Sequence, residues 1–164
     1  MKATRAIEAG LLGGLLITGG EWVARQFGVP IAIEPMFGTL FGLGVGPGAW
    51  FLGWVIQMIV SAIVGLVYAW GFEFVTHKAD WGVGFGFGWI HAAIAGLYMA
   101  WIPAMNPLMP ETMSAPGIFL SSLGWAGITT FVLLHLLYGS VVGAMYGPVK
   151  HQVPHPTPQP HPAA

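Results

Sequence analysis

Two histidines stand in stretches of sequence that are otherwise almost entirely apolar. His91 lies in GFGWIHAAIAG, residues 86–96, and His135 lies in FVLLHLLYGS, residues 131–140. Paired imidazoles can ligate a haem iron axially, and neutral imidazole also binds copper and other divalent metals. Alternatively each ring donates a hydrogen bond to a neighbouring helix, with Gln57 and Tyr138 as candidate partners. A third interpretation is a proton or small-solute pathway lined by these four side chains.

A second group of metal-ligand candidates consists of thioethers. Three methionines recur at a spacing of four in AMNPLMPETMSAPG, residues 104–117. Thioether sulfur is a soft ligand that suits Cu(I). Prolines interrupt this segment and leave the spacing without a fixed geometry, so methionines that fill irregular gaps are the favoured interpretation. The candidates are Met105, Met109 and Met113.

Catalytic motifs are absent from the sequence. The chain has no cysteine, which excludes thiol nucleophiles and thiolate metal sites. The glycine-rich runs GLGVGPG and GVGFGFG lack the lysine or the preceding strand that a nucleotide-binding loop requires. No Gly-x-Ser-x-Gly or His-Glu-x-x-His motif occurs. We therefore expect a protein that is not an enzyme.

The composition indicates the solvent in which these side chains operate. The chain has 164 residues, of which 55% are hydrophobic and 7% are charged. Soluble domains carry about 25% charged residues, so the favoured partner of this surface is the lipid bilayer. The formal net charge of −1 provides no basic patch and argues against binding of nucleic acid.

Four apolar segments have the length of about 20 residues that a membrane-spanning helix needs. The predicted spans are about 6–25, 50–71, 82–103 and 122–146, within one membrane domain at 1–148. Between the first two spans, residues 26–48 are apolar and rich in Gly and Pro, which predicts a re-entrant or interfacial loop with a short helix around 35–43. Residues 149–164 are rich in Pro and His and predict a disordered cytoplasmic tail.

Charged residues set the predicted orientation and raise one open question. Four of the five basic residues fall on one side of the four spans, which predicts a multi-pass protein of the inner (cell) membrane with both termini in the cytoplasm. The exception, Arg25, stands four residues after Glu21, at the spacing of a helical ion pair. Glu34 lies in the apolar loop, and the sequence assigns it no partner.

Each predicted span carries its polar side chain on a face of small residues. In lipid, helices associate through small residues that allow close approach and through interhelical hydrogen bonds. A buried imidazole without a partner would cost several kcal/mol, so both histidines should face other helices. The helix-packing positions are Ser61, Gly65, Gly84, Gly88, Gly139, Gly143 and Gly147. Residues 57–68 align with 135–146, pairing Gln57 with His135, which indicates a duplicated helical hairpin.

The ending HLLYGSVVGAMYGP, with a GW-x-x-polar start in an earlier span, resembles an uncharacterised family of small four-helix bacterial membrane proteins. The last helix of that family reads His-Leu-x-Tyr-Gly-x-x-x-Gly-x-x-Tyr-Gly. The resemblance implies a four-helix membrane fold and marks His135, Tyr138, Gly139, Gly143, Tyr146 and Gly147 as characteristic positions. It implies no activity. Gln57 departs from the family, which often has His at that position.

The sequence therefore predicts an all-α integral membrane protein with four helices in a Gly-rich up-down bundle. The favoured function is a non-catalytic accessory or structural subunit that packs against other membrane proteins or against copies of itself, without a cofactor. The alternatives are a haem- or copper-binding protein that uses His91 and His135, and a proton or small-solute pathway.

Overall fold

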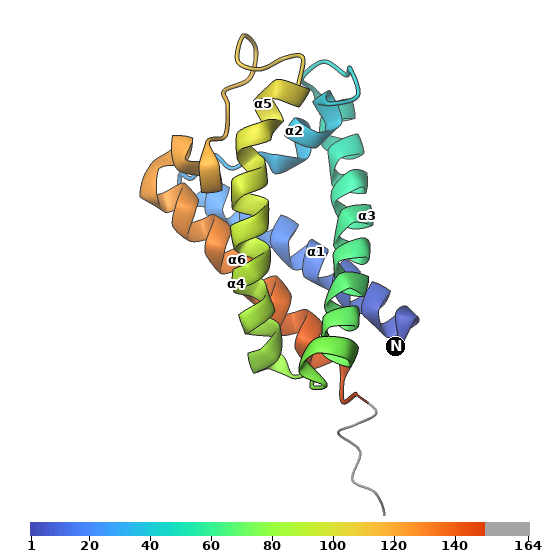
Figure 1. The fold of residues 1–164 in the computed structure, drawn as a ribbon. Helices are drawn as coiled ribbons and strands as arrows, with labels where there is room; N and C mark the ends of the chain where they lie inside the picture. The colour runs from blue at the N-terminus through green and yellow to red at the C-terminus, as the bar shows by residue number, and fades with distance from the viewer. Residues whose placement is uncertain (150–164) are drawn as a thin grey trace, which may run out of the picture.

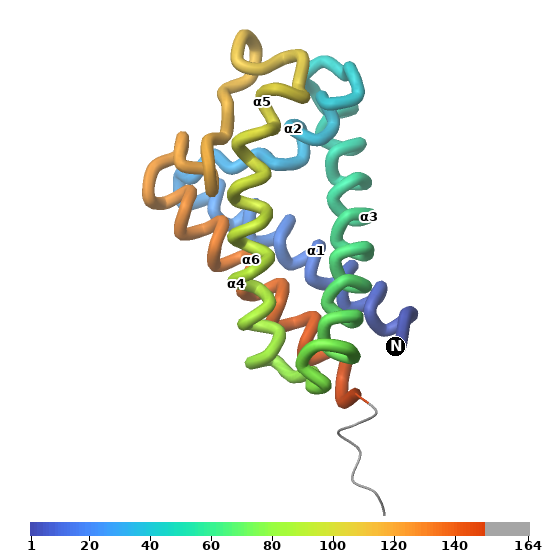
Figure 2. Tube along the Cα trace, viewed as in Figure 1, coloured from blue at the N-terminus to red at the C-terminus, as the bar shows by residue number. Residues whose placement is uncertain are grey.

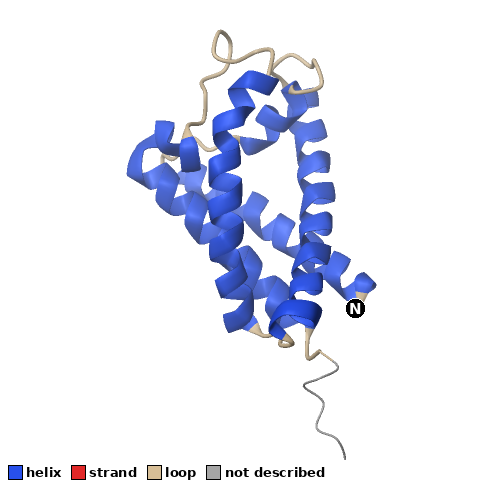
Figure 3. Cartoon of the chain, in the orientation of Figure 1, coloured by secondary structure: helices blue, strands red, loops and turns tan. Residues whose placement is uncertain are grey.

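The computed structural model describes residues 1–149, and the predicted tail from residue 150 onward lies outside the described residues. Within residues 1–149 every regular element is a helix and no strand occurs (Figures 1 and 3). The predicted all-α class is confirmed.

Four long helices cover the four segments that the sequence marks as apolar, and two short helices lie in the connections between them. The helices are α1 (Ala3–Gln26), α2 (Ile33–Thr39), α3 (Pro47–Gly71), α4 (Trp81–Tyr98), α5 (Ile102–Met105) and α6 (Gly124–Tyr146). A π-helical turn at Phe72–Thr76 prolongs α3, and 3₁₀ turns at Met99–Trp101 and Ile118–Leu123 flank α5 and α6. The short helix predicted around 35–43 is α2, which begins earlier and packs against α3.

Three of the long helical segments are long and apolar enough to cross a membrane: Pro47–Thr76, Trp81–Met105 and Ile118–Tyr146. Among the described residues α1 does not reach that level of hydropathy, although its 24 residues give it the length. The physical reason lies in its composition, because Glu8, Glu21 and several glycines dilute its leucines. The count of four spans is therefore not shown by hydropathy.

Large apolar side chains cover much of the outer surface. Trp22, Trp81 and Trp125 are 58%, 69% and 82% exposed. Exposed tryptophans at helix ends are typical of the interface between lipid headgroups and acyl chains. The surface is therefore compatible with a bilayer as its solvent.

The helix ends are set by local signals. Asp80 is the N-cap of α4, and its Oδ1 accepts a hydrogen bond from the backbone N–H of Val83 at 2.8 Å. The other carboxylate oxygen lies 2.8 Å from Lys78 Nζ. The hydrogen bond from Lys78, followed by the one from Val83, lowers the pKa of Asp80 below its ordinary value.

Replacing Asp80 by asparagine is expected to cause a small, pH-dependent loss of stability. Because its pKa is depressed in the folded state, the ionised carboxylate stabilises the fold at pH values above the unfolded pKa of about 3.9. That contribution is lost as the pH falls through the lower, folded-state pKa. Thermal unfolding in detergent should therefore separate Asp80→Asn from wild type at pH 7. The separation should narrow below about pH 3.9, and a gap that widens on acidification would contradict this account.

The helices pack as two pairs joined through their inner members. α1 packs closely against α3, α4 packs closely against α6, and α1 contacts α6. In the trace, α1 and α6 cross behind α3 and α4 (Figure 2). α3 and α4 follow one another in the chain, but they make few direct contacts.

Glycine allows the backbones of α4 and α6 to meet. A Cβ added to Gly84 would collide with the carbonyl oxygen of Gly139, and one added to Gly143 would collide with the carbonyl oxygen of Asp80. A Cβ on Gly88 would lie 2.9 Å from the carbonyl oxygen of His135. No other residue type fits these positions without moving a helix.

The α1–α3 pair crosses in the same register. A Cβ on Gly65 would collide with the carbonyl oxygen of Ala6 and lie 3.0 Å from the Cα of Gly10. At Gly143 the corresponding neighbours are the carbonyl oxygen of Asp80 and the Cα of Gly84. In both pairs the second contact stands four residues after the first.

Two apolar clusters close the ends of the bundle. The first gathers the ends of α3 and α6 with the start of α1 and includes Tyr68, Phe72 and Tyr146. The second gathers α2, the 3₁₀ turns and the start of α6 and includes Ile33, Leu120 and Phe131. The space between these clusters holds the polar side chains.

Candidate functional site

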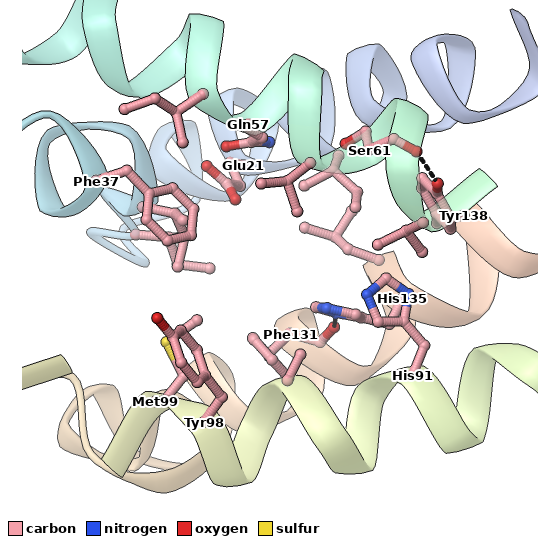
Figure 4. Close-up of a pocket in the computed structure, with 18 of the residues that line it drawn as sticks. Glu21, Phe37, Gln57, Ser61, His91, Tyr98, Met99, Phe131, His135 and Tyr138 are labelled. Atoms are coloured by element: carbon pink, nitrogen blue, oxygen red, sulfur yellow. Dashed lines mark hydrogen bonds between the residues drawn. The ribbon is translucent and has the colours of Figure 1, made fainter. Parts of the chain in front are cut away.

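A cavity of about 400 Å³ lies between α3 and α4, with α1, α2 and α6 also contributing to its wall. Most of its lining is apolar. Figure 4 shows α3 along one side of the cavity and α4 along the other, with polar side chains pointing into the space between them. Its polar lining residues are Glu21, Gln57, Ser61, His91, Tyr98, His135 and Tyr138.

All four polar residues that the sequence singled out line this cavity. Gln57 comes from α3, His91 from α4, and His135 and Tyr138 from α6. The rings of His91 and His135 are 4.6 Å apart between centroids, and His91 is 5.4 Å from Tyr138. His91 stands ten residues after the start of α4, which at the helical rise places it about 15 Å along the helix. The histidines therefore do meet, deep inside the bundle.

The imidazoles have hydrogen-bond partners within the chain. Nδ1 of His135 lies 2.8 Å from the carbonyl oxygen of Phe131, one turn earlier in α6. Nδ1 of His91 lies 3.3 Å from the hydroxyl of Tyr68 on α3. This is the hydrogen-bonding alternative that the sequence analysis weighed against a cofactor, with Tyr68 as a partner that it did not name.

Gln57 and Tyr138 each link the cavity to another helix. The amide nitrogen of Gln57 donates to Oγ1 of Thr18 on α1 at 3.2 Å. The hydroxyl of Tyr138 donates to the carbonyl oxygen of Ser61 on α3 at 2.5 Å. Because the α6 hydroxyl reaches the backbone of α3, this bond ties the two helix pairs together across the bundle.

The placement of the two histidines does not fit a haem between them. An axial pair lies on opposite faces of the macrocycle, whereas a centroid separation of 4.6 Å leaves no room for a porphyrin between the rings. For copper, the two rings supply at most two nitrogen ligands. Among residues 1–149 no group of three or more His, Cys, Asp or Glu gathers around a common point.

The three methionines do not share one environment. Met105 ends α5 and is 44% exposed, and its sulfur lies 3.9 Å from the hydroxyl of Tyr98. Met109 is buried in the apolar cluster beside α2, and Met113 packs against the same cluster. Their role in the structure is packing.

Six of the predicted helix-packing residues lie at the two close crossings: Ser61, Gly65, Gly84, Gly88, Gly139 and Gly143. These crossings hold each helix pair rigidly at the level of the cavity. Gly147 does not continue the face. It is the C-cap of α6 with φ of 71°, a left-handed conformation that glycine adopts without strain, and its role is to end the helix.

The sequence analysis missed a buried charged network at one end of the cavity. Nη1 of Arg25 lies 4.0 Å from Oε2 of Glu21 and 3.6 Å from Oε2 of Glu34. Both glutamates are buried, at 2% and 3% exposed. Arg25 is therefore the partner of Glu34, and one guanidinium serves two carboxylates. The available signal was that Arg25 is the nearest cation in the sequence to the only charge in residues 26–48.

The cavity opens sideways rather than toward either end of the bundle. Phe41, Val60 and Tyr98 line it and are also 69%, 44% and 45% exposed. They follow α2 and lie on the facing helices α3 and α4. An opening bordered by these side chains faces the same surroundings as the apolar outer surface.

No protein-family model, no curated protein and no solved structure matches this chain. The resemblance of its last helix to a family of small bacterial membrane proteins therefore stays a prediction. The case for function rests on the cavity.

Proposed function

We propose that this chain is a non-catalytic integral membrane protein that binds a small, mainly apolar molecule in the cavity between α3 and α4. The observation that carries the proposal is the convergence of Gln57, His91, His135 and Tyr138 on one cavity with an apolar wall. A volume of about 400 Å³ falls in the range of small-molecule sites, which combine an apolar lining with a few placed polar groups.

The shape of the cavity favours binding over passage through the protein. A proton or solute pathway needs a polar route to both ends of the bundle, but apolar clusters close both ends. The exposed residues Phe41, Val60 and Tyr98 instead border a lateral opening. In a bilayer such an opening would admit a molecule that is already dissolved among the acyl chains.

We further propose that α1 completes a four-span bundle derived from a duplicated hairpin. Its support is the equal register of the α1–α3 and α4–α6 crossings, in which Gly65 and Gly143 occupy equivalent places. The backbone N–H of Lys2 donates to the hydroxyl of Tyr146 at 2.9 Å, which supports termini on the same side of the membrane. Inner-membrane localisation with both termini in the cytoplasm is part of this proposal.

The accessory-subunit hypothesis drew its argument from the small-residue faces. Those faces are occupied inside the chain by the α1–α3 and α4–α6 crossings, so they give no reason to expect an external partner. The hypothesis predicts that a larger membrane protein, or a second copy, co-purifies stoichiometrically in mild detergent. Binding by an isolated monomer would favour the cavity proposal instead.

The binding proposal is tested by filling the cavity. Full-length protein in nanodiscs of zwitterionic lipid is expected to bind the fluorescent probe naphthylethanol saturably, beyond its partition into empty nanodiscs. Ala95 lines the cavity, so the indole in Ala95→Trp should occupy the site and abolish saturable binding. Equilibrium dialysis measures both quantities.

The matched control is Ala93→Trp on the exposed side of the same helix, which should bind like wild type. Helical circular dichroism and size-exclusion profiles confirm that each variant is folded. The proposal fails if wild-type protein takes up no more probe than empty nanodiscs, or if both tryptophan variants bind equally.

A further inference from the structure

The polar atoms of the cavity are hydrogen-bond acceptors. The nitrogen of Gln57 is used by Thr18, and its Oε1 is buried with no hydrogen-bond partner among the described residues. Oε2 of Glu21 is likewise buried and unpartnered within residues 1–149. Both residues line the cavity and are at least nine-tenths buried, at 6% and 2% exposed.

The hydrogen bonds of the other polar residues leave acceptors as well. The hydroxyl hydrogen of Tyr138 is committed to the carbonyl of Ser61, so only its oxygen lone pairs remain. A carbonyl can only accept, so Nδ1 of His135 carries the hydrogen that reaches Phe131. Nε2 of the neutral ring is then an acceptor. A ligand that satisfies these atoms must itself donate hydrogen bonds.

The charges near Glu21 point in the same direction. Two buried carboxylates, Glu21 and Glu34, share the single guanidinium of Arg25. The hydrogen bond from Nη1 of Arg25 goes to the carbonyl oxygen of Ile31 at 2.8 Å, and neither Oε2 atom receives one. When both acids are ionised, the network carries one negative charge in excess, which Glu21 presents to the cavity.

The remainder of the wall suits an organic group. Aromatic rings line the cavity from α2 and α4, at Phe37 and Tyr98, on opposite sides of the space near Glu21 (Figure 4). Aromatic faces attract ammonium groups. A bare metal ion would find few ligands here, because no cluster of three or more His, Cys, Asp or Glu occurs in the described part of the chain.

We infer that the occupant of this cavity is an amphipathic organic cation, with an ammonium group held by Glu21 and Gln57 and an apolar body along α3, α4 and α6. This inference rests on the proposed binding function and specifies the charge and hydrogen-bonding character of the ligand. The ammonium hydrogens satisfy the two unpartnered acceptors, and the positive charge balances the second carboxylate.

The test compares two probes that share an apolar body. Naphthylethylammonium and naphthylethanol are titrated against full-length protein in zwitterionic nanodiscs, with empty nanodiscs subtracted. Wild type should bind the ammonium at least about tenfold more tightly, as expected for hydrogen bonds to a charged group. Glu21→Gln, which keeps the shape and removes the charge, should abolish the preference and leave the affinity for the alcohol unchanged.

Glu8→Gln is the matched control, because Glu8 lies on the exposed side of the same helix and should keep the full preference. Where Glu21→Gln does not fold, Gln57→Leu provides the decision and should reduce the preference several-fold. Equal binding of the two probes by wild type, or an unchanged preference in the variants, overturns the inference. If neither probe binds above empty nanodiscs, the binding proposal itself fails.

Discussion

Replacing Gly84 by alanine is expected to lower the free energy of unfolding by about 3 kcal/mol, at the upper end of the usual cost of overpacking. A Cβ at this position collides with the carbonyl oxygen of Gly139 and would lie 3.0 Å from the Cα of Gly143. Both neighbours are backbone atoms in the middle of α6, so no side chain can rotate away. The helices must separate, and contacts along the whole crossing weaken. Denaturant titration in detergent, followed by circular dichroism, measures the change.

Gly86→Ala is the matched control, because Gly86 is on the same helix and a Cβ there meets nothing within 4 Å. Alanine has the higher helix propensity, so this variant should be neutral or more stable by up to about 1 kcal/mol. Similar losses in the two variants would show that the glycines matter through helix propensity or hydration, and the close crossing would lose its assigned role.

The faces of these helices could be predicted from the sequence because helical spacing fixes which side chains share a side. Gly84 and Gly88 share a face with His91, and Gly139 and Gly143 share one with His135, as the structure has them. Spacing also aligned residues 57–68 with 135–146, in the register at which the two crossings occur. These are properties of single helices, and they need no knowledge of the neighbours.

The sequence could not indicate which faces meet. A small-residue face packs equally well against a helix of the same chain or of another protein, so the glycines could be interpreted as sites for a partner subunit. Which helix lies beside which depends on the connections, such as the turn at Gly28 with φ of 83° that helps return the chain toward α3. The accessory-subunit hypothesis followed from this missing information.

The cavity was likewise hidden from sequence reasoning. Its volume exists because α3 and α4, though consecutive in the chain, stand apart on the two sides of α1 and α6. Nothing in the composition of either helix fixes that separation. Tyr68 illustrates the same point, since its contact with His91 joins α3 to α4 across positions 23 residues apart.

Replacing Arg25 by methionine is expected to destabilise the protein by about 3–5 kcal/mol, because removing one partner of a buried ionic network leaves the other charges uncompensated. Arg25 is the cation within ion-pair distance of both Glu21 and Glu34. Its guanidinium also lies 5.2 Å from the ring centroid of Trp50 and donates to the carbonyl of Ile31. Methionine retains the length of the side chain but none of these polar contacts. Unfolding in detergent at pH 7 is the measurement, with Arg5→Met at an exposed position of the same helix as the control.

A compensated variant separates the charge from the packing of Arg25. When Arg25→Met is combined with Glu21→Gln and Glu34→Gln, no ionised group remains in the network, and most of the lost stability should return. Recovery to within about 1–2 kcal/mol of wild type is expected, since the carbonyl of Ile31 still loses a donor. If the triple variant is no more stable than Arg25→Met alone, the guanidinium stabilises α1 and α2 through its stacking on Trp50 and its bond to Ile31. The excess negative charge that Glu21 presents to the cavity would then lose its main support.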